Sequence, residues 1–108
     1  MKTIHIDDGI IKIAENIKDN FELINTSNKD DIWFHLEKYP SFHLSLCPFN
    51  KNNVSDTIIL QASLLCKQSS MFKNFNNINV IYTKFENIYK DENNNFKFTI
   101  KEPQTICI

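Results

Sequence analysis

Asp31-Ile32-Trp33-Phe34-His35 decides how this chain folds, because its side chains alternate between two kinds of surface. Successive side chains of a β-strand point to opposite faces of a sheet, so Ile32 and Phe34 share one face. Asp31, Trp33 and His35 share the other. The first face is an ordinary core stripe. The second carries a carboxylate, an indole and an imidazole in a row, which indicates a half-buried polar network or a surface that recognises a ligand.

A second strand is predicted at about residues 42–47, beyond a turn at Pro40. Its apolar residues alternate with His43, Ser45 and Cys47, which again gives one apolar face and one polar face. The two strands therefore form a hairpin, and a histidine from each strand lies on its polar side.

Two helices are predicted on either side of this hairpin. A short helix at about 15–24 precedes it, and the longest periodic segment, about 54–72, follows it. The long segment has one apolar stripe that faces the core and a second stripe through Leu60, Leu64 and Met71. A helix that is apolar on more than one side is sandwiched, either inside the domain or against a partner.

The remaining apolar runs are short and rich in residues that favour strands. They predict strands at about 2–6, 10–14, 78–82, 96–100 and 105–108, and turns at 7–9 and 91–95. The predicted fold class is α+β. Residues 1–108 form a single domain, mainly antiparallel sheet with one long and one short helix.

Length and composition agree with one folded domain. A chain of 108 residues with 42% hydrophobic residues is of ordinary domain size and can fill one core. No apolar run approaches the roughly 20 residues of a membrane span, so we expect no membrane partner. Cys47, Cys66 and Cys107 are odd in number and widely spaced, which favours free thiols and a cytoplasmic location.

The charged residues limit the kinds of partner that the chain can bind. It has twelve lysines, no arginine and a net charge of −1. A strongly basic surface is therefore excluded, and lysine does not offer the bidentate fork that reads guanine in a duplex groove. Any contact with phosphate must come from lysine.

Three chemical readings of the polar hairpin face remain. Asp31, His35, His43 and Cys47 are all zinc-ligand types, but no closely spaced Cys or His pair anchors a site, so we expect no metal and no cofactor. An RNA-modifying or hydrolytic enzyme would use His35 and His43 with Asp31 as acid–base groups, and Cys47 is a candidate nucleophile. Because ordinary strand packing accounts for these residues, we assign no catalytic residue.

Lysines alternate with aromatic residues in the second half of the chain. The lysines Lys67, Lys84 and Lys90 lie near the aromatic residues Phe72 and Tyr82. Lysines for phosphates and flat rings for stacking are what a nucleic-acid surface needs. A solvated helix end beside core aromatics would give the same pattern.

Several strings occur in the order found in the NFACT-R domain, the RNA-binding module of the NFACT family. They are Asp30-Asp31-Ile32-Trp33-Phe34-His35, Pro40-(x2)-His43, Ala62-(x4)-Lys67-(x1)-Ser69-Ser70, Asn79-Val80-Ile81-Tyr82-Thr83 and Asn87-Ile88-Tyr89-Lys90. Residues 10–108 resemble this domain, in the form found in short eukaryotic members and here without their coiled coil. The chain has Ala14 and Ser41-Phe42 where the family usually has glycine, and an acidic loop at 91–95 where a basic loop is usual.

The resemblance implies an RNA-binding module for structured RNA, with tRNA or ribosomal RNA as the first expectation, in translation or ribosome-associated quality control. DNA is the partner of some relatives. The residues expected to bind nucleic acid are Trp33, His35, His43, Lys67, Ser69, Tyr82, Thr83, Lys84 and Lys90. We expect the lysines to gather beside the indole and the imidazoles, and we expect modest, salt-sensitive affinity.

Two alternatives stay open beside RNA binding. One is a protein-interaction or homodimerisation module that uses Leu60, Leu64 and Met71. The other is the enzyme described above, which requires that Asp31, His35 and His43 converge.

Overall fold

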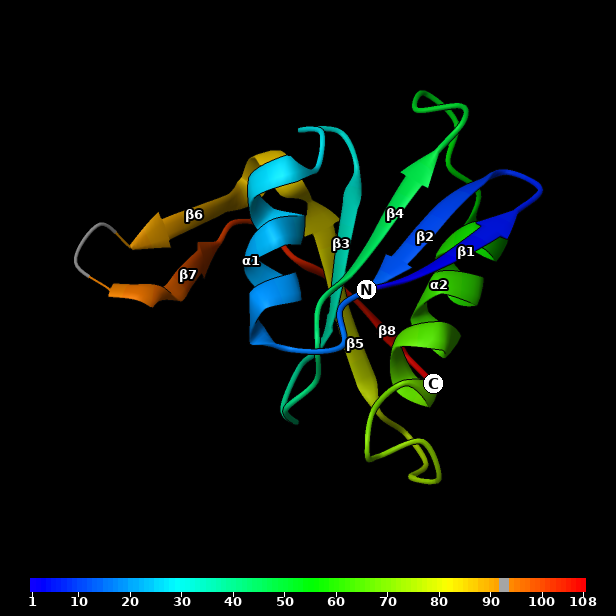
Figure 1. Cartoon of the computed structure of the whole chain (residues 1–108). Coiled ribbons are helices and arrows are strands. Elements are labelled where there is room, and N and C mark those ends of the chain that lie inside the picture. The colour runs from blue at the N-terminus through cyan, green and yellow to red at the C-terminus, as the bar shows by residue number, and fades with distance from the viewer. Residues whose placement is uncertain (92–93) are drawn as a thin grey trace.

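The computed structural model describes residues 1–91 and 94–108 (Figure 1). Its elements follow one another in the order strand hairpin, helix, strand hairpin, helix, then four strands. They are β1 (Lys2–Ile6), β2 (Gly9–Ile13), α1 (Ile17–Thr26), β3 (Ile32–Leu36), β4 (Leu44–Pro48), α2 (Asp56–Gln68), β5 (Asn79–Lys84), the 3-10 turn η1 (Phe85–Asn87), β6 (Ile88–Asp91), β7 (Asn94–Ile100) and β8 (Gln104–Cys107). The predicted α+β class with mostly antiparallel strands is confirmed.

The main sheet has six strands in the order β1-β2-β4-β3-β5-β8, and every neighbouring pair is antiparallel. The deciding stretch forms β3, which lies between β4 and β5. β6 and β7 form a separate two-stranded hairpin that is not hydrogen-bonded to this sheet. In Figure 1 the hairpin projects sideways beside α1, away from β1 and β2.

The core lies between α2 and one face of the sheet. Phe34 and Leu36 of β3 and Leu44 and Leu46 of β4 are completely buried there, as the alternation in the sequence predicts. They pack against α2, whose Ala62 is also completely buried. The apolar stripe of the opening stretch is thus the centre of the core.

The opposite face of the sheet is covered by α1 and by the β6–β7 hairpin (Figure 1). Asn16 caps α1 by accepting a hydrogen bond from the backbone N–H of Asp19, 2.8 Å away. Asn20 of α1 accepts a hydrogen bond of 2.8 Å from the backbone N–H of His43, just before β4. This bond fixes the helix over the polar side of the β3–β4 hairpin.

α2 is shorter than the segment 54–72 that periodicity predicts. Ser55 caps its N-terminus, and the helix ends at Gln68. The Ser69 and Ser70 hydroxyls then donate to the backbone carbonyls of Cys66 and Lys67. Serine side chains that bond to the backbone compete with helix continuation, which accounts for the early end.

The single glycine lies where the sheet leaves no room for a side chain. A Cβ atom on Gly9 would lie 2.5 Å from the carbonyl oxygen of Cys47 on the neighbouring strand β4.

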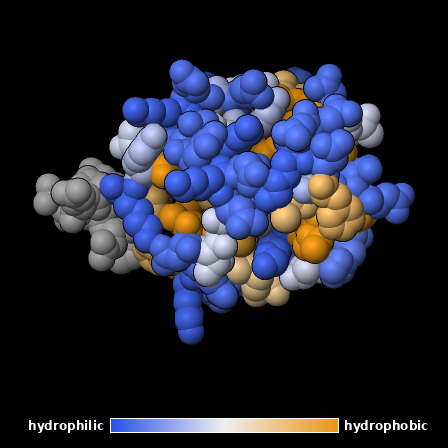
Figure 2. Space-filling view, turned by 90° about the horizontal axis from the view of Figure 1, so that it is seen from above, coloured by the Kyte–Doolittle hydropathy of each residue, from blue (hydrophilic) through white to orange (hydrophobic). Residues whose placement is uncertain are grey.

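The predicted turn at 91–95 includes residues 92–93, which lie outside the described part of the chain. Within that part, no helix is long and apolar enough to span a membrane. Seen from above, the surface is mainly hydrophilic, with apolar side chains in separate patches (Figure 2).

Candidate nucleic-acid interface

Three of the predicted site residues form one cluster of rings on the α1 side of the sheet. The Trp33 and His35 rings lie nearly parallel, with 5.7 Å between their centroids and 9° between their planes. The His43 ring stands edge-on to both, 5.5 Å from each centroid. Trp33 and His35 are two positions apart on β3, so their side chains lie on the same face of the sheet. His43 lies beside them because it directly precedes β4, the strand that pairs with β3.

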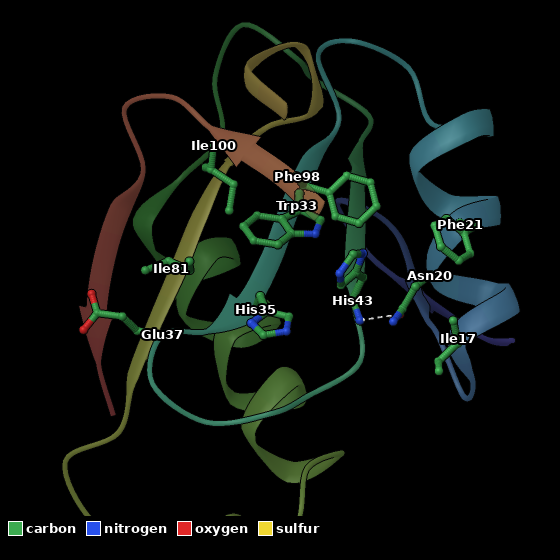
Figure 3. Close-up of a pocket in the computed structure, with 10 residues that line it drawn as sticks. All are labelled: Ile17, Asn20, Phe21, Trp33, His35, Glu37, His43, Ile81, Phe98 and Ile100. Atoms are coloured by element: carbon green, nitrogen blue, oxygen red, sulfur yellow. Dashed lines mark hydrogen bonds between the residues drawn. The ribbon is translucent and has the colours of Figure 1, made fainter. Parts of the chain in front are cut away.

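The ring cluster lines a hollow of about 460 Å³ between the sheet, α1 and the β6–β7 hairpin (Figure 3). The lining residues are Ile17, Asn20 and Phe21 from α1, Trp33, His35, Glu37, His43 and Ile81 from the sheet side, and Phe98 and Ile100 from β7. The volume lies in the range of pockets that hold small organic molecules.

The hairpin wall of the hollow is held by side-chain contacts. The Phe98 ring lies 6.2 Å from the Phe21 ring of α1 and 5.9 Å from the His43 ring, measured between centroids. Lys90 pairs with Phe98 across the two strands, so both side chains lie on the same face of the hairpin. The Lys90 ammonium donates a hydrogen bond to the side-chain oxygen of Asn25 on α1.

Two buried nitrogen atoms of the ring cluster have no hydrogen-bond partner among the described residues. They are Nε1 of Trp33, a residue that is 4% exposed, and Nδ1 of His43, which is 8% exposed. A buried polar group without a partner costs roughly 1–3 kcal/mol, and most such groups in folded proteins are satisfied. The hollow beside these two atoms is therefore the candidate site for a ligand that would give them partners.

Both histidines of the cluster are neutral near pH 7. Burial and, to a smaller extent, the neighbouring His35 together lower the pKa of His43 to about 4. Burial also lowers the pKa of His35, although hydrogen bonds with the backbone of Leu36 and Ser41 oppose the shift. The Nδ1 atom of His35 lies 2.6 Å from the Leu36 carbonyl, so this nitrogen carries the proton of the neutral ring.

Asp31 does not join the two histidines in the polar network that the sequence suggests. Its carboxylate accepts a hydrogen bond from the backbone N–H of Asn28 at 3.1 Å and lies 3.5 Å from the Lys51 ammonium. Four residues of strand separate Asp31 from His35 by roughly 13 Å along the chain. Cys47 lies near the carboxylate instead, and burial followed by the Asp31 charge raises the pKa of its thiol.

The predicted residues of β5 divide between the two faces of the sheet. Thr83 pairs with Trp33, so it lies on the α1 side, where its hydroxyl bonds to Lys101 and Asn87. Tyr82 pairs with Phe34, and Lys84 with Ile32, which places both on the α2 side. The Tyr82 ring stacks on the Phe34 ring with 5.5 Å between centroids.

Lys67 and Ser69 also belong to the α2 side. The Lys67 ammonium donates to the Ile108 carbonyl at 3.2 Å, and the Ser69 hydroxyl bonds within the last turn of α2. Of the three predicted phosphate-binding lysines, only Lys90 lies on the side of the ring cluster. The expectation that they gather on one surface is wrong for Lys67 and Lys84, and the two-residue period of β5 already separates Lys84 from Thr83.

The α1 and hairpin residues that complete the hollow are absent from the predicted site residues, chiefly Asn20, Phe21 and Phe98. Phe98 is visible in the alternation of 96–100, but alternation does not tell which other element a strand faces. Among the described residues, no three His, Cys, Asp or Glu side chains form a group that could hold a metal ion.

The fold and the hollow define a small α+β domain that carries its candidate binding surface on one face of an antiparallel sheet. The family model described as the NFACT protein RNA binding domain matches residues 3–100, and the chain belongs to this family. Coiled-coil domain-containing protein 25 from Bos taurus and from Mus musculus are each 32% identical to it over 84 residues. These residues cover 74% of the chain and 40% of each relative. The chain thus spans about two-fifths of the length of these curated relatives.

Among solved structures, the C-terminal part of the fibronectin/fibrinogen-binding protein from Streptococcus suis has the same fold. It superposes with a TM-score of 0.83 at 21% identity and covers 98% of this chain and 43% of that one. At this identity the likeness establishes the fold alone.

Proposed function

We propose that residues 1–108 form a non-catalytic module that binds structured RNA, with tRNA or ribosomal RNA as its first candidates. The setting is translation or ribosome-associated quality control in the cytoplasm. Membership of a family described as an RNA binding domain supports the class of ligand. The bound surface is the α1 side of the sheet.

The observation that carries this proposal is the cluster of Trp33, His35 and His43 at the hollow. RNA-binding proteins recognise unstacked bases with flat aromatic or imidazole rings held on a rigid sheet. Here the rings come from β3 and from the start of β4 in the middle of a six-stranded sheet, and α1 is bonded across to His43. Because these rings are held rigidly, contact with a base that enters the hollow would cost little side-chain entropy.

The charge on this side of the molecule sets the strength of binding. Lys90 contributes one ammonium group beside the hollow, whereas Lys67 and Lys84 lie on the α2 side. Each phosphate contact changes the slope of log affinity against log salt by about 0.7–0.9. We therefore expect a shallow slope and modest affinity, and the same surface accepts single-stranded DNA more weakly.

The test is fluorescence anisotropy with labelled bulk tRNA at two salt concentrations, using Lys90→Gln and the matched control Lys84→Gln. We expect Lys90→Gln to weaken binding several-fold and to reduce the salt slope by about 1. Lys84→Gln removes the same charge from the other side of the sheet and should leave both quantities near the wild-type values. Equal effects of the two changes would contradict the proposal, as would a failure of tRNA to bind.

The enzyme alternative loses its support from the geometry. It requires Asp31 to orient His35 or His43, but the Asp31 carboxylate is bonded to Asn28 and approached by Lys51. A general base works best when its pKa lies near the operating pH, and the pKa of His43 is about 4. We therefore do not propose it.

One observation supports the alternative of a protein-interaction module, namely the exposed apolar side chains on and just after α2. Leu60 and Leu64 are exposed on one side of α2, and Met71, just beyond the helix, is 90% exposed. Contiguous exposed apolar side chains are typical of protein contacts. Sedimentation across a concentration series, with Leu60→Ser/Leu64→Ser as the control, tests for a homodimer. A monomer at every concentration would remove this second candidate.

A further inference from the structure

Two buried ring nitrogens beside the hollow have no hydrogen-bond partner among the described residues. Nε1 of Trp33 is a hydrogen-bond donor only, and Nδ1 of neutral His43 is a donor or an acceptor according to its tautomer. Both belong to flat rings that stand against other flat rings. The occupant that fits is therefore flat, uncharged and equipped with hydrogen-bonding groups along its edge. A nucleobase has these properties, whereas a ribose or a phosphate does not.

The position of the two nitrogens shows how such an occupant reaches them. In Figure 3 the nitrogen of the Trp33 indole lies on the edge that faces His43 and Phe98. Because both atoms are buried, the Phe98 ring must move for a ligand to contact them. Phe98 belongs to the β6–β7 hairpin, which is not hydrogen-bonded to the main sheet. A small shift of the hairpin thus opens the buried edge without breaking a strand pair of that sheet.

A candidate group for binding phosphate, the Lys90 ammonium, lies beside the same wall. Lys90 lies across the hairpin from Phe98, and its ammonium is bonded to the neutral side chain of Asn25 at an exposed position. A phosphate would be a stronger partner than the amide, because it places a negative charge opposite the ammonium in addition to accepting its hydrogen bond. Base and phosphate sites thus lie next to each other, as the two ends of one nucleotide require.

We propose that the hollow takes one unstacked base of a bound RNA and that Lys90 binds the phosphate of the same nucleotide. This inference rests on the RNA binding proposed above and specifies its ligand. A base inside a continuous helix is stacked and cannot enter, so the domain prefers RNA with a bulged or looped-out nucleotide. The Trp33 N–H and the His43 ring then contact the edge of the base, and the surrounding rings pack against it.

The experiment compares two labelled RNA hairpins that differ by a single bulged nucleotide, with the intact chain and anisotropy as the measurement. Stacking of one base on aromatic rings is worth about 1–3 kcal/mol, so we expect about tenfold tighter binding of the bulged hairpin. Trp33 is the only tryptophan, and its fluorescence reports occupancy of the hollow directly. The bulged hairpin should quench it, and the paired hairpin should not.

Three variants separate a role in base capture from a role in folding. Trp33→Phe keeps a flat ring but removes the unpartnered N–H, and Phe98→Ala removes the wall. Both should reduce the preference for the bulge, measured as the ratio of the two affinities, to about twofold or less. Phe75→Ala removes a ring that contacts only Tyr39 and Phe72 among the ring contacts of the described residues, and it should keep the full preference.

The outcomes distinguish this inference from the proposed function. Equal binding of the two hairpins without quenching of Trp33 would overturn base capture and leave RNA binding intact. Binding of neither hairpin would overturn both. Free adenosine, guanosine, cytidine and uridine monophosphates form a further arm of the experiment. Quenching by a monophosphate, without a preference between the hairpins, would assign the hollow to a free nucleotide and overturn the inference.

Discussion

The two faces of the six-stranded sheet differ in how completely their buried groups are satisfied. The α2 face is an apolar core built on Phe34, Leu36 and their neighbours, and among the described residues it buries one hydroxyl without a partner, that of Ser63 on α2. The α1 face carries Trp33 and His43, both with an unpartnered ring nitrogen, beside a hollow. One face is packed for stability. The other holds unpartnered buried polar groups, which destabilise the fold and which a hydrogen-bonding ligand would satisfy.

This difference explains why two adjacent residues on one strand have different roles. Phe34 and Trp33 are both large buried aromatic residues on β3, but Phe34 packs in the core cluster and stacks on Tyr82. Trp33 touches two histidines and the wall of a space that is large enough for a ligand. The predictions below test this division, beginning with the largest effect.

Phe34→Ala should cause the greatest loss of stability. The Phe34 side chain is completely buried in the central strand and stacks on Tyr82, so truncation leaves a cavity in the core. Such changes cost about 3–5 kcal/mol, a large part of the stability of a domain of this size. Urea unfolding followed by Trp33 fluorescence measures the change. Phe75→Ala, at a half-exposed ring, should cost less than about 1 kcal/mol. Similar losses in the two variants would contradict the assignment of the core face.

Acid should destabilise the protein through the α1 face. The pKa of His43 is about 4 in the folded chain and 6.5 without burial, so the unfolded state binds the proton more readily. Its contribution is complete above pH 6.5 and is lost as the pH falls toward 4, by about 3 kcal/mol in total. His35, whose pKa is also lowered, acts in the same direction.

The free energy of unfolding between pH 7 and pH 5 measures this effect. His43→Asn should flatten the pH dependence, because it removes the group that takes up the proton. His5→Asn, at an exposed position on β1, is the matched control and should retain the wild-type slope. A slope that is unchanged in His43→Asn would show that another group causes the acid sensitivity.

Trp33→Phe should have the smallest effect on stability of these changes. The variant loses part of a buried ring, which is destabilising, but it also removes a buried N–H without a partner, which is stabilising. The net change should lie within about 1 kcal/mol, measured by urea unfolding with circular dichroism. A loss as large as that of Phe34→Ala would mean that Trp33 is a core residue and that the two faces do not differ.

The sequence predicted those parts of the fold that depend on local patterns. The alternation of residues 31–36 gave β3 and both of its faces, and the deciding stretch with His43 gave the ring cluster. The end of α2 was missed because side-chain hydrogen bonds of Ser69 and Ser70 overrode a continuing apolar period. A periodic pattern does not include such competition.

The composition of the hollow could not be predicted, because it depends on how distant elements pack. Phe21 and Phe98 are far apart in sequence and meet only through the docking of the hairpin on α1. The distribution of lysines could have been predicted in part. The two-residue period of a strand places Lys84 and Thr83 on different faces of the sheet. The face of Lys84 could be identified as the α2 face only once the pairing of β5 with β3 was known.

The most direct test of the central claim is a ¹H–¹⁵N NMR titration of the isotope-labelled chain with the bulged RNA hairpin. A single tryptophan gives a single indole N–H signal, which reports on the α1 face, while the backbone signals of Leu60 and Leu64 report on α2. We predict that the indole signal of Trp33 and the signals around Phe98 shift, and that the α2 signals stay in place. Shifts confined to α2, with an unmoved indole signal, would contradict the account.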